Sequence, residues 1–165
     1  MIRMIVLALA LAGCAAPAQP QTAAAAFAPL VGCWRGAFEN QPDIRDERCF
    51  QTLGEHLVDT HAVRPTAYAG EATYHLDETS GEIVFAYASN DGGRSNGSVR
   101  RNGERYVFAP HTHRGGDGAE LRLRATWTVE EPDRFVAATE REEGGMWRPF
   151  MRITYTRASD VETPS

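Results

Sequence analysis

The sequence predicts an all-β domain whose most economical form is an up-and-down antiparallel β-barrel of about ten strands. Short segments of the chain alternate between apolar and polar residues, which is typical of strands with one buried face. Turn-forming residues separate these segments at regular intervals, and no segment has the apolar periodicity of a helix of ordinary length. Closing such a meander into a barrel removes the exposed sheet edges. A β-sandwich is the alternative architecture.

The predicted strands follow one another along most of the chain. The clearest alternation is in 121–129, where apolar residues occupy one face and arginine or threonine the other. Asn102 and Gly103 form a dipeptide suited to a type I′ turn between two strands. The predicted strands are 31–40, 45–52, 56–63, 70–77, 83–87, 95–101, 104–110, 121–129, 135–141 and 147–157.

The length and the charge limit the function classes. A chain of 165 residues suits one domain that can bury a core. The formal net charge of −5 argues against a nucleic-acid partner, because phosphate-binding surfaces are normally basic. The predicted organisation is a signal peptide at 1–13, an Ala/Pro/Gln-rich tether at 14–29, the barrel domain at 30–157 and a polar tail at 158–165.

The first residues have the pattern of a secretion signal. Arg3 precedes an apolar run that is too short to span a bilayer. The run ends in Leu-Ala-Gly followed by Cys14, which resembles the lipobox of bacterial lipoproteins. The resemblance implies that Cys14 receives a diacylglycerol, that the signal is cut before it, and that the new amino terminus is acylated, for example with palmitate. Ala15 at the next position implies sorting to the outer membrane, with the domain in the periplasm.

Three cysteines occur in the chain. If Cys14 carries lipid, Cys33 and Cys49 remain as a pair in an oxidising compartment, which favours a disulfide between the first two strands. Such a bond closes a loop of about 16 residues, for which the chain-entropy model gives about 3 kcal/mol. Two free buried thiols are the alternative.

The start and the end of the barrel region share a pattern with a known superfamily. Gly32 and Trp34 resemble the Gly-x-Trp motif that opens calycins, the lipocalin and fatty-acid-binding superfamily. In that group an arginine of the last strand packs across the tryptophan and closes the barrel end, and Arg157 has the matching position. A guanidinium on an indole face stabilises by roughly 0.5–2 kcal/mol. The resemblance implies a structural role for these three residues.

The longer pattern, which adds Gly36 and the segment 73–93, resembles the bacterial nitrobindin-like and DUF1579-like barrels. Nitrobindins hold haem through a histidine late in the chain. No histidine follows His113 here, which counts against haem bound in that way. The sequence therefore predicts no cofactor.

No catalytic constellation stands out, which favours a protein that is not an enzyme. The chain has no Gly-x-Ser-x-Gly motif and no phosphate-binding glycine loop. His111 and His113 have a spacing that can serve zinc, with Asp117, His61 or His75 as conceivable third ligands. A solvent-exposed pair beside a Gly-rich loop is the favoured interpretation, so no metal is predicted.

Three functional hypotheses follow. The first is a binding module that holds a small apolar or amphipathic ligand in the barrel, anchored to the membrane by lipid. The second is a structural or interaction lipoprotein with a filled barrel, and the third is a haem protein or enzyme of the nitrobindin kind. The residues predicted to line a ligand cavity are Phe38, Leu57, His61, Tyr74, Phe85, Tyr87, Trp127, Met151 and Tyr155.

Overall fold

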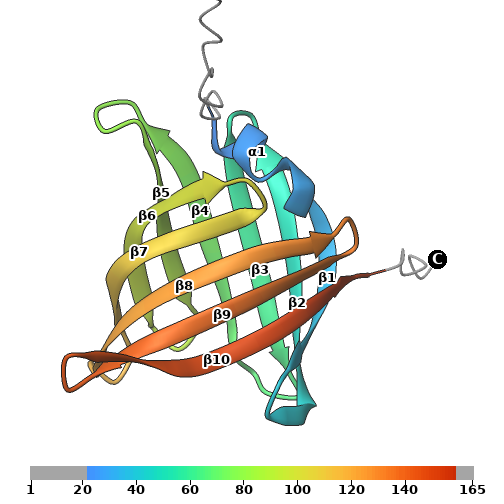
Figure 1. The fold of residues 1–165 in the computed structure, drawn as a ribbon. Helices are drawn as coiled ribbons and strands as arrows, with labels where there is room; N and C mark the ends of the chain where they lie inside the picture. Colours follow the sequence, from blue (N-terminus) through green and yellow to red (C-terminus); the bar gives the residue numbers. More distant parts are fainter. Residues whose placement is uncertain (1–21, 159–165) are drawn as a thin grey trace, which may run out of the picture.

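Ten antiparallel strands form a closed barrel in the computed structural model, which describes residues 22–158 (Figure 1). Each strand pairs with its neighbours in the sequence, and β1 pairs with β10 to close the sheet. This confirms the predicted fold class. The strands are β1 Gly32–Phe38, β2 Gln41–Leu53, β3 His56–Arg64, β4 Ala69–Asp77, β5 Glu82–Ser89, β6 Arg94–Asn102, β7 Arg105–Arg114, β8 Glu120–Glu131, β9 Arg134–Glu143 and β10 Met146–Arg157.

A short N-terminal segment closes one end of the barrel. It consists of α1 (Ala23–Ala26), Phe27 and the 3-10 turn η1 (Ala28–Leu30), and Figure 1 shows α1 at the same end as the turn between β2 and β3. The Ala24 amide donates to the Glu55 carbonyl in that turn (3.1 Å). The folded unit therefore begins before residue 30, because the apolar side chains of 23–30 cover the barrel end.

Phe27 is the centre of this plug. Its side chain is fully buried and stacks on Tyr106, with ring centroids 4.6 Å apart. It also contacts Tyr74 at 4.8 Å between centroids. The Tyr106 hydroxyl donates to the Ala26 carbonyl (3.0 Å), which ties the plug to β7. An aromatic cluster of the strands thus continues directly into the N-terminal segment.

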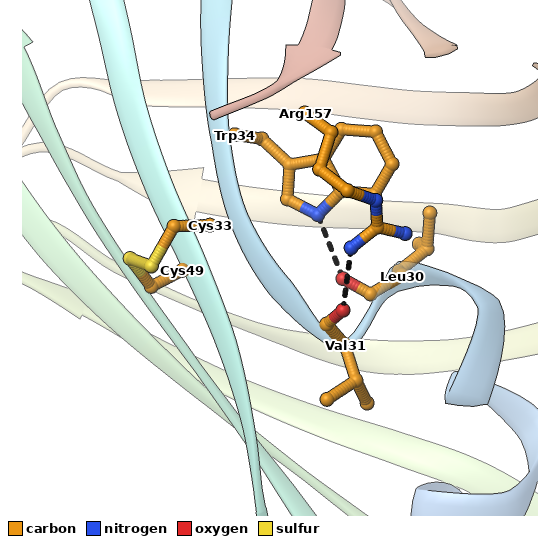
Figure 2. Close-up of a disulfide and its surroundings, with 6 residues drawn as sticks. All are labelled: Leu30, Val31, Cys33, Trp34, Cys49 and Arg157. Carbon is orange, nitrogen blue, oxygen red and sulfur yellow. Dashed lines mark hydrogen bonds between the residues drawn. A yellow bond between two sulfur atoms is a disulfide. The ribbon is translucent and has the colours of Figure 1, made fainter. Parts of the chain in front are cut away.

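The first strand is joined to both of its neighbours near the plug (Figure 2). Cys33 and Cys49 face each other on β1 and β2 and form the predicted disulfide, which is confirmed. Arg157 lies over the indole of Trp34, with its guanidinium carbon 4.2 Å from the ring centroid. The indole nitrogen donates to the Leu30 carbonyl (2.7 Å). The arrangement links the start and the end of the barrel sequence.

Register shifts interrupt several strand pairs, and two of them affect the strands that line the cavity wall. The pairing of β7 with β8 shifts between Phe108 and His111, and the pairing of β10 with β9 shifts between Pro149 and Met151. A bulge inserts an extra residue, so that the faces exchange beyond it. On β7 this reverses the inward face past Phe108.

None of the helices described within 22–158 is long and apolar enough to cross a membrane.

Candidate functional site

A cavity of about 390 Å³ lies inside the barrel, beyond the aromatic core that packs on the plug. Tyr68, in the loop between β3 and β4, and Phe150, which is 45% exposed, are part of its lining. The cavity therefore extends toward the end opposite the plug. Its size falls within the range of small-molecule sites, which is roughly 300–1,000 Å³.

The cavity has one apolar wall, from β8, β9 and β10. These strands alternate, so that small and medium apolar side chains face inward while charged ones face out. The outward residues include Arg124 and Glu140, which pair across the strands at 2.6 Å. Besides the aromatic residues Trp127, Phe150 and Tyr155, the inward residues of this wall are Leu121, Leu123, Ala125, Ala137, Thr139, Met151 and Ile153.

A polar cluster forms the facing wall, on β2 and β3. Arg48 is its centre: Nε donates to Asp46 Oδ2 (3.2 Å) and Nη1 donates to Asp59 Oδ2 (2.8 Å). The guanidinium carbon lies 5.3 Å from the Trp127 ring centroid and 5.6 Å from that of Tyr155. A buried guanidinium is therefore paired with two carboxylates and enclosed by two aromatic faces.

The two carboxylates differ in their surroundings. Burial alone would raise the pKa of Asp46, but the hydrogen bond with His61 and the charge of Arg48 outweigh it and lower the pKa to about 2. Burial raises the pKa of Asp59 against the opposing effect of Arg48. One oxygen of Asp59, Oδ1, is buried and accepts no hydrogen bond from the described residues. The negative charge of Asp46 is thus well compensated by its partners, whereas a negative charge on Asp59 is compensated less well.

A chain of hydrogen bonds extends from the cluster toward the open end. Asp46 Oδ1 bonds to His61 Nδ1 (2.9 Å), and His61 Nε2 bonds to the Tyr87 hydroxyl (3.0 Å). The Tyr87 hydroxyl bonds in turn to that of Tyr68 (2.6 Å). Tyr155 also donates to Asp46. Since burial and the Tyr68 hydrogen bond raise the pKa of Tyr87, its phenol is protonated at neutral pH and acts as a hydrogen-bonding group.

Two further histidines face the cavity from β7. His113 Nδ1 bonds to the Ser95 hydroxyl (2.8 Å), and His111 Nδ1 bonds to the Ala109 carbonyl (2.9 Å). Burial lowers the pKa of His111. The expectation of a solvent-exposed pair was wrong, because the bulge after Phe108 turns both rings inward and β7 continues to Arg114.

The structure does not complete a zinc site around these histidines. Within residues 22–158, no group of three histidine, cysteine or acidic side chains is placed to hold a metal ion. His75 lies on the outer face of β4, with its ring near His56. Both ring nitrogens of His61 are already bonded, one to Asp46 and the other to Tyr87.

The predicted cavity residues lie along the cavity with one exception. Leu57 is fully buried in the core instead, because its place on β3 is next to the plugged end. The predicted residues that do line the cavity are Phe38, His61, Tyr74, Phe85, Tyr87, Trp127, Met151 and Tyr155. Contact of these residues with a ligand stays a prediction.

Sequence reasoning missed the charged centre of the site. Asp46 and Arg48 lie in a strand with many polar residues, which is typical of a solvent-facing strand. The available signal was their position: both share a face with Phe50, and Phe50 is buried. Tyr68 and Ser95 were missed as well, since neither lies in an apolar alternation.

No family model and no curated protein matches the chain. The fold resembles that of Rv2717c. The match to the crystal structure of Rv2717c from M. tuberculosis has a TM-score of 0.57 and 15% sequence identity, and it covers 83% of this chain and 98% of that one. The likeness covers nearly the whole of that protein and concerns the fold.

Proposed function

We propose that this protein is a lipid-anchored protein of the cell envelope whose barrel binds a small apolar or amphipathic ligand. One observation carries the proposal: the barrel encloses a cavity of about 390 Å³ with an apolar wall opposite a hydrogen-bonding one. Ligand sites are typically concave and mostly apolar, with a few polar groups that orient the ligand. The cavity disfavours the hypothesis of a filled barrel with a purely structural role.

The composition of the two walls supports an amphipathic ligand in particular. The wall from β8 to β10 is mostly hydrocarbon, and its Tyr155 hydroxyl is already bonded to Asp46, so it suits an acyl or ring system. The facing wall offers the Arg48 guanidinium from β2 and the His61 imidazole from β3, and the phenols of Tyr68 and Tyr87 continue it. A ligand with one polar end and an apolar body satisfies both walls at once. The proposal includes no catalytic step and no resident cofactor.

The location in the envelope rests on the sequence before residue 22. Cys14 ends the lipobox-like segment, and it lies outside the described residues. The disulfide between Cys33 and Cys49 agrees with an oxidising compartment. Anchoring by more than one acyl chain gives persistent membrane attachment. We propose the outer membrane as the site of attachment, with the barrel in the periplasm and the membrane as its partner.

Binding of an uncharged fluorescent probe tests the ligand proposal. N-Phenyl-1-naphthylamine fluoresces more strongly in apolar surroundings, and we expect saturable binding to the oxidised protein. Ala125→Phe, which fills the cavity from β8, should abolish the signal. Ala88→Phe, on the exposed outer face of β5, is the matched control and should bind like the wild type. A filled, non-binding wild-type barrel would refute the proposal, and a Soret band upon haem addition would favour the nitrobindin-like alternative.

Labelling tests the anchor independently. Cells that express the full chain should incorporate radioactive palmitate into it, and the protein should fractionate with the outer membrane. Cys14→Ser should lose the label and appear in a soluble fraction. An unlabelled wild-type protein would exclude lipidation and leave the ligand proposal unaffected.

A further inference from the structure

A guanidinium has two edges on which it can bind both oxygens of a carboxylate. In Arg48 the protein already occupies part of each edge. Such a carboxylate accepts two parallel hydrogen bonds, either from Nε and Nη2 or from Nη1 and Nη2. Here Nε is bonded to Asp46 and Nη1 to Asp59. Each edge therefore has one nitrogen taken by a carboxylate of the protein. A ligand carboxylate cannot bind the Nε/Nη2 edge by two hydrogen bonds, and on the Nη1/Nη2 edge it would have to share Nη1 with Asp59.

One nitrogen of Arg48 is still available. Nη2 makes no hydrogen bond to the residues in 22–158, and it is not among the buried atoms that lack a partner. It therefore has access to the cavity that Arg48 lines. A guanidinium nitrogen is a donor only, so its partner must supply a single acceptor such as a carbonyl, ether or hydroxyl oxygen.

The charge around Arg48 also disfavours an anion. Asp46 and Asp59 both lie within hydrogen-bond distance of the guanidinium, and Asp59 Oδ1 has no donor among the described residues. Both ring nitrogens of His61 are already bonded, one to Asp46 and one to the Tyr87 hydroxyl, so His61 has no unused donor for an anion. In a region of low dielectric, a third carboxylate would meet two existing ones at close range. Desolvating it there is costly without a free cation.

The rest of the polar wall suits a neutral group. The hydroxyls of Tyr68 and Tyr87 form a bonded pair that lines the cavity, and each can donate or accept a hydrogen bond. The opposite wall is mostly apolar, and the remaining polar lining, Ser95, His111 and His113, is bonded within β6 and β7. The geometry points to an uncharged amphiphile, such as a fatty alcohol or a fatty-acid ester, with its oxygen on Arg48 Nη2 and free fatty acids disfavoured. This inference rests on the proposed function and names the ligand class of the same cavity.

A matched set of ligands tests this selectivity. Lauryl alcohol, methyl laurate and laurate share one chain length and differ in the head group. Each is used to displace N-phenyl-1-naphthylamine from the wild-type protein at neutral pH, where laurate is ionised. We expect the alcohol and the ester to compete at concentrations about tenfold or more below that of laurate, which is a difference of about 1.4 kcal/mol. Equal or tighter binding of laurate would overturn the inference and leave the proposed function standing.

Two substitutions of Asp59 distinguish the effect of its charge from the effect of its hydrogen bond to Nη1. Asp59→Ala frees Nη1, completes one edge of Arg48 and removes a negative charge, so the affinity for laurate should rise about tenfold or more relative to the alcohol. Asp59→Asn removes the charge but keeps an oxygen for Nη1, and it should raise laurate affinity less. If the probe binds the wild type but no ligand displaces it, the inference fails alone. If the probe itself does not bind, the proposed function fails with it.

Discussion

Tyr155 donates a hydrogen bond to Asp46 across an intervening strand. Tyr155 is on β10 and Asp46 is on β2, and both pair with Gly36 of β1. Because Gly36 has no side chain, the tyrosine ring passes over the backbone of β1 and reaches the carboxylate. A Cβ at this position would lie 2.6 Å from the tyrosine ring and 2.7 Å from Ile153.

Gly36→Ala should therefore lower the free energy of unfolding. The added methyl forces the Tyr155 ring and Ile153 to move, and overpacking of this kind typically costs about 1–3 kcal/mol. Urea denaturation measures the loss. Ala37→Val, which adds methyl groups on the exposed outer face of the same strand, is the control and should change stability little. An unchanged urea midpoint for Gly36→Ala would contradict the role of this crossing.

The strands and the barrel closure could be predicted because their signals are local. Alternation with a period of two is visible in the sequence, and it located all ten strands to within a few residues. The predicted strands 31–40 and 45–52 leave a turn at 41–44, but the turn lies at residues 39–40. β2 already begins at Gln41, and Pro42 is tolerated because it lies where the pairing of β1 with β2 shifts register.

The site was harder to predict because it depends on pairs that are distant in the sequence. Arg48 is buried only because Asp46 and Asp59 compensate it, and that relation needs the register of β2 and β3. His111 faces inward only because of a bulge, which strict alternation does not show. The alanines before Phe27 have the composition of a linker, yet they pack on the barrel end.

Phe27→Ala tests the plug. The ring is fully buried among Tyr74, Tyr106 and Trp127, so truncation removes its contacts and leaves a cavity. We expect a loss of about 3–5 kcal/mol in the free energy of unfolding, measured by guanidinium denaturation. Leu53→Ala, at an apolar residue that is 67% exposed, should lose far less. Equal losses for the two variants would show that the N-terminal segment does not stabilise the barrel.

Arg157→Met tests the closure at Trp34. The guanidinium lies on the indole and donates to the carbonyls of Pro29, Val31 and Pro132, at 2.8–3.1 Å. Because the side chain is exposed, solvent weakens these interactions, and a loss of about 1–2 kcal/mol is expected by thermal or urea unfolding. Probe affinity should be unchanged, since Arg157 is remote from the cavity lining. Arg152→Met on the same strand should leave stability within error, and a similar loss there would argue against a specific role for Arg157.

Removing the disulfide should lower the stability of the barrel without changing its affinity for the probe. Cys33 and Cys49 are on strands that pair directly, and neither side chain lines the cavity. The Cys33→Ser, Cys49→Ser double variant should lose about 3 kcal/mol of unfolding free energy in the chain-entropy model, with unchanged affinity for the fluorescent probe. Reduction of the wild type with dithiothreitol should reproduce the loss. Reduced protein that binds the probe more weakly would instead connect the disulfide to the cavity.

His111 should make the barrel less stable in mild acid. Burial lowers the pKa of folded His111, whereas an unfolded histidine titrates near about 6.5. Between these two values the unfolded chain binds a proton that the folded chain does not, so the unfolding free energy falls as the pH decreases through this window. The slope from one group is at most about 1.4 kcal/mol per pH unit. Urea denaturation of the wild type and of His111→Gln, at several pH values between neutrality and about pH 5, isolates this effect by difference.

The comparison with the variant is needed because Asp59 lines the same cavity. Burial raises the pKa of Asp59, which has the opposite effect on stability, since it favours the folded state as the pH falls. The His111→Gln variant should show a flatter decline toward acid than the wild type. His75→Gln, on the exposed face of β4, should decline as the wild type does. Parallel curves for wild type and His111→Gln would mean that His111 is protonated as readily in the folded barrel as in water.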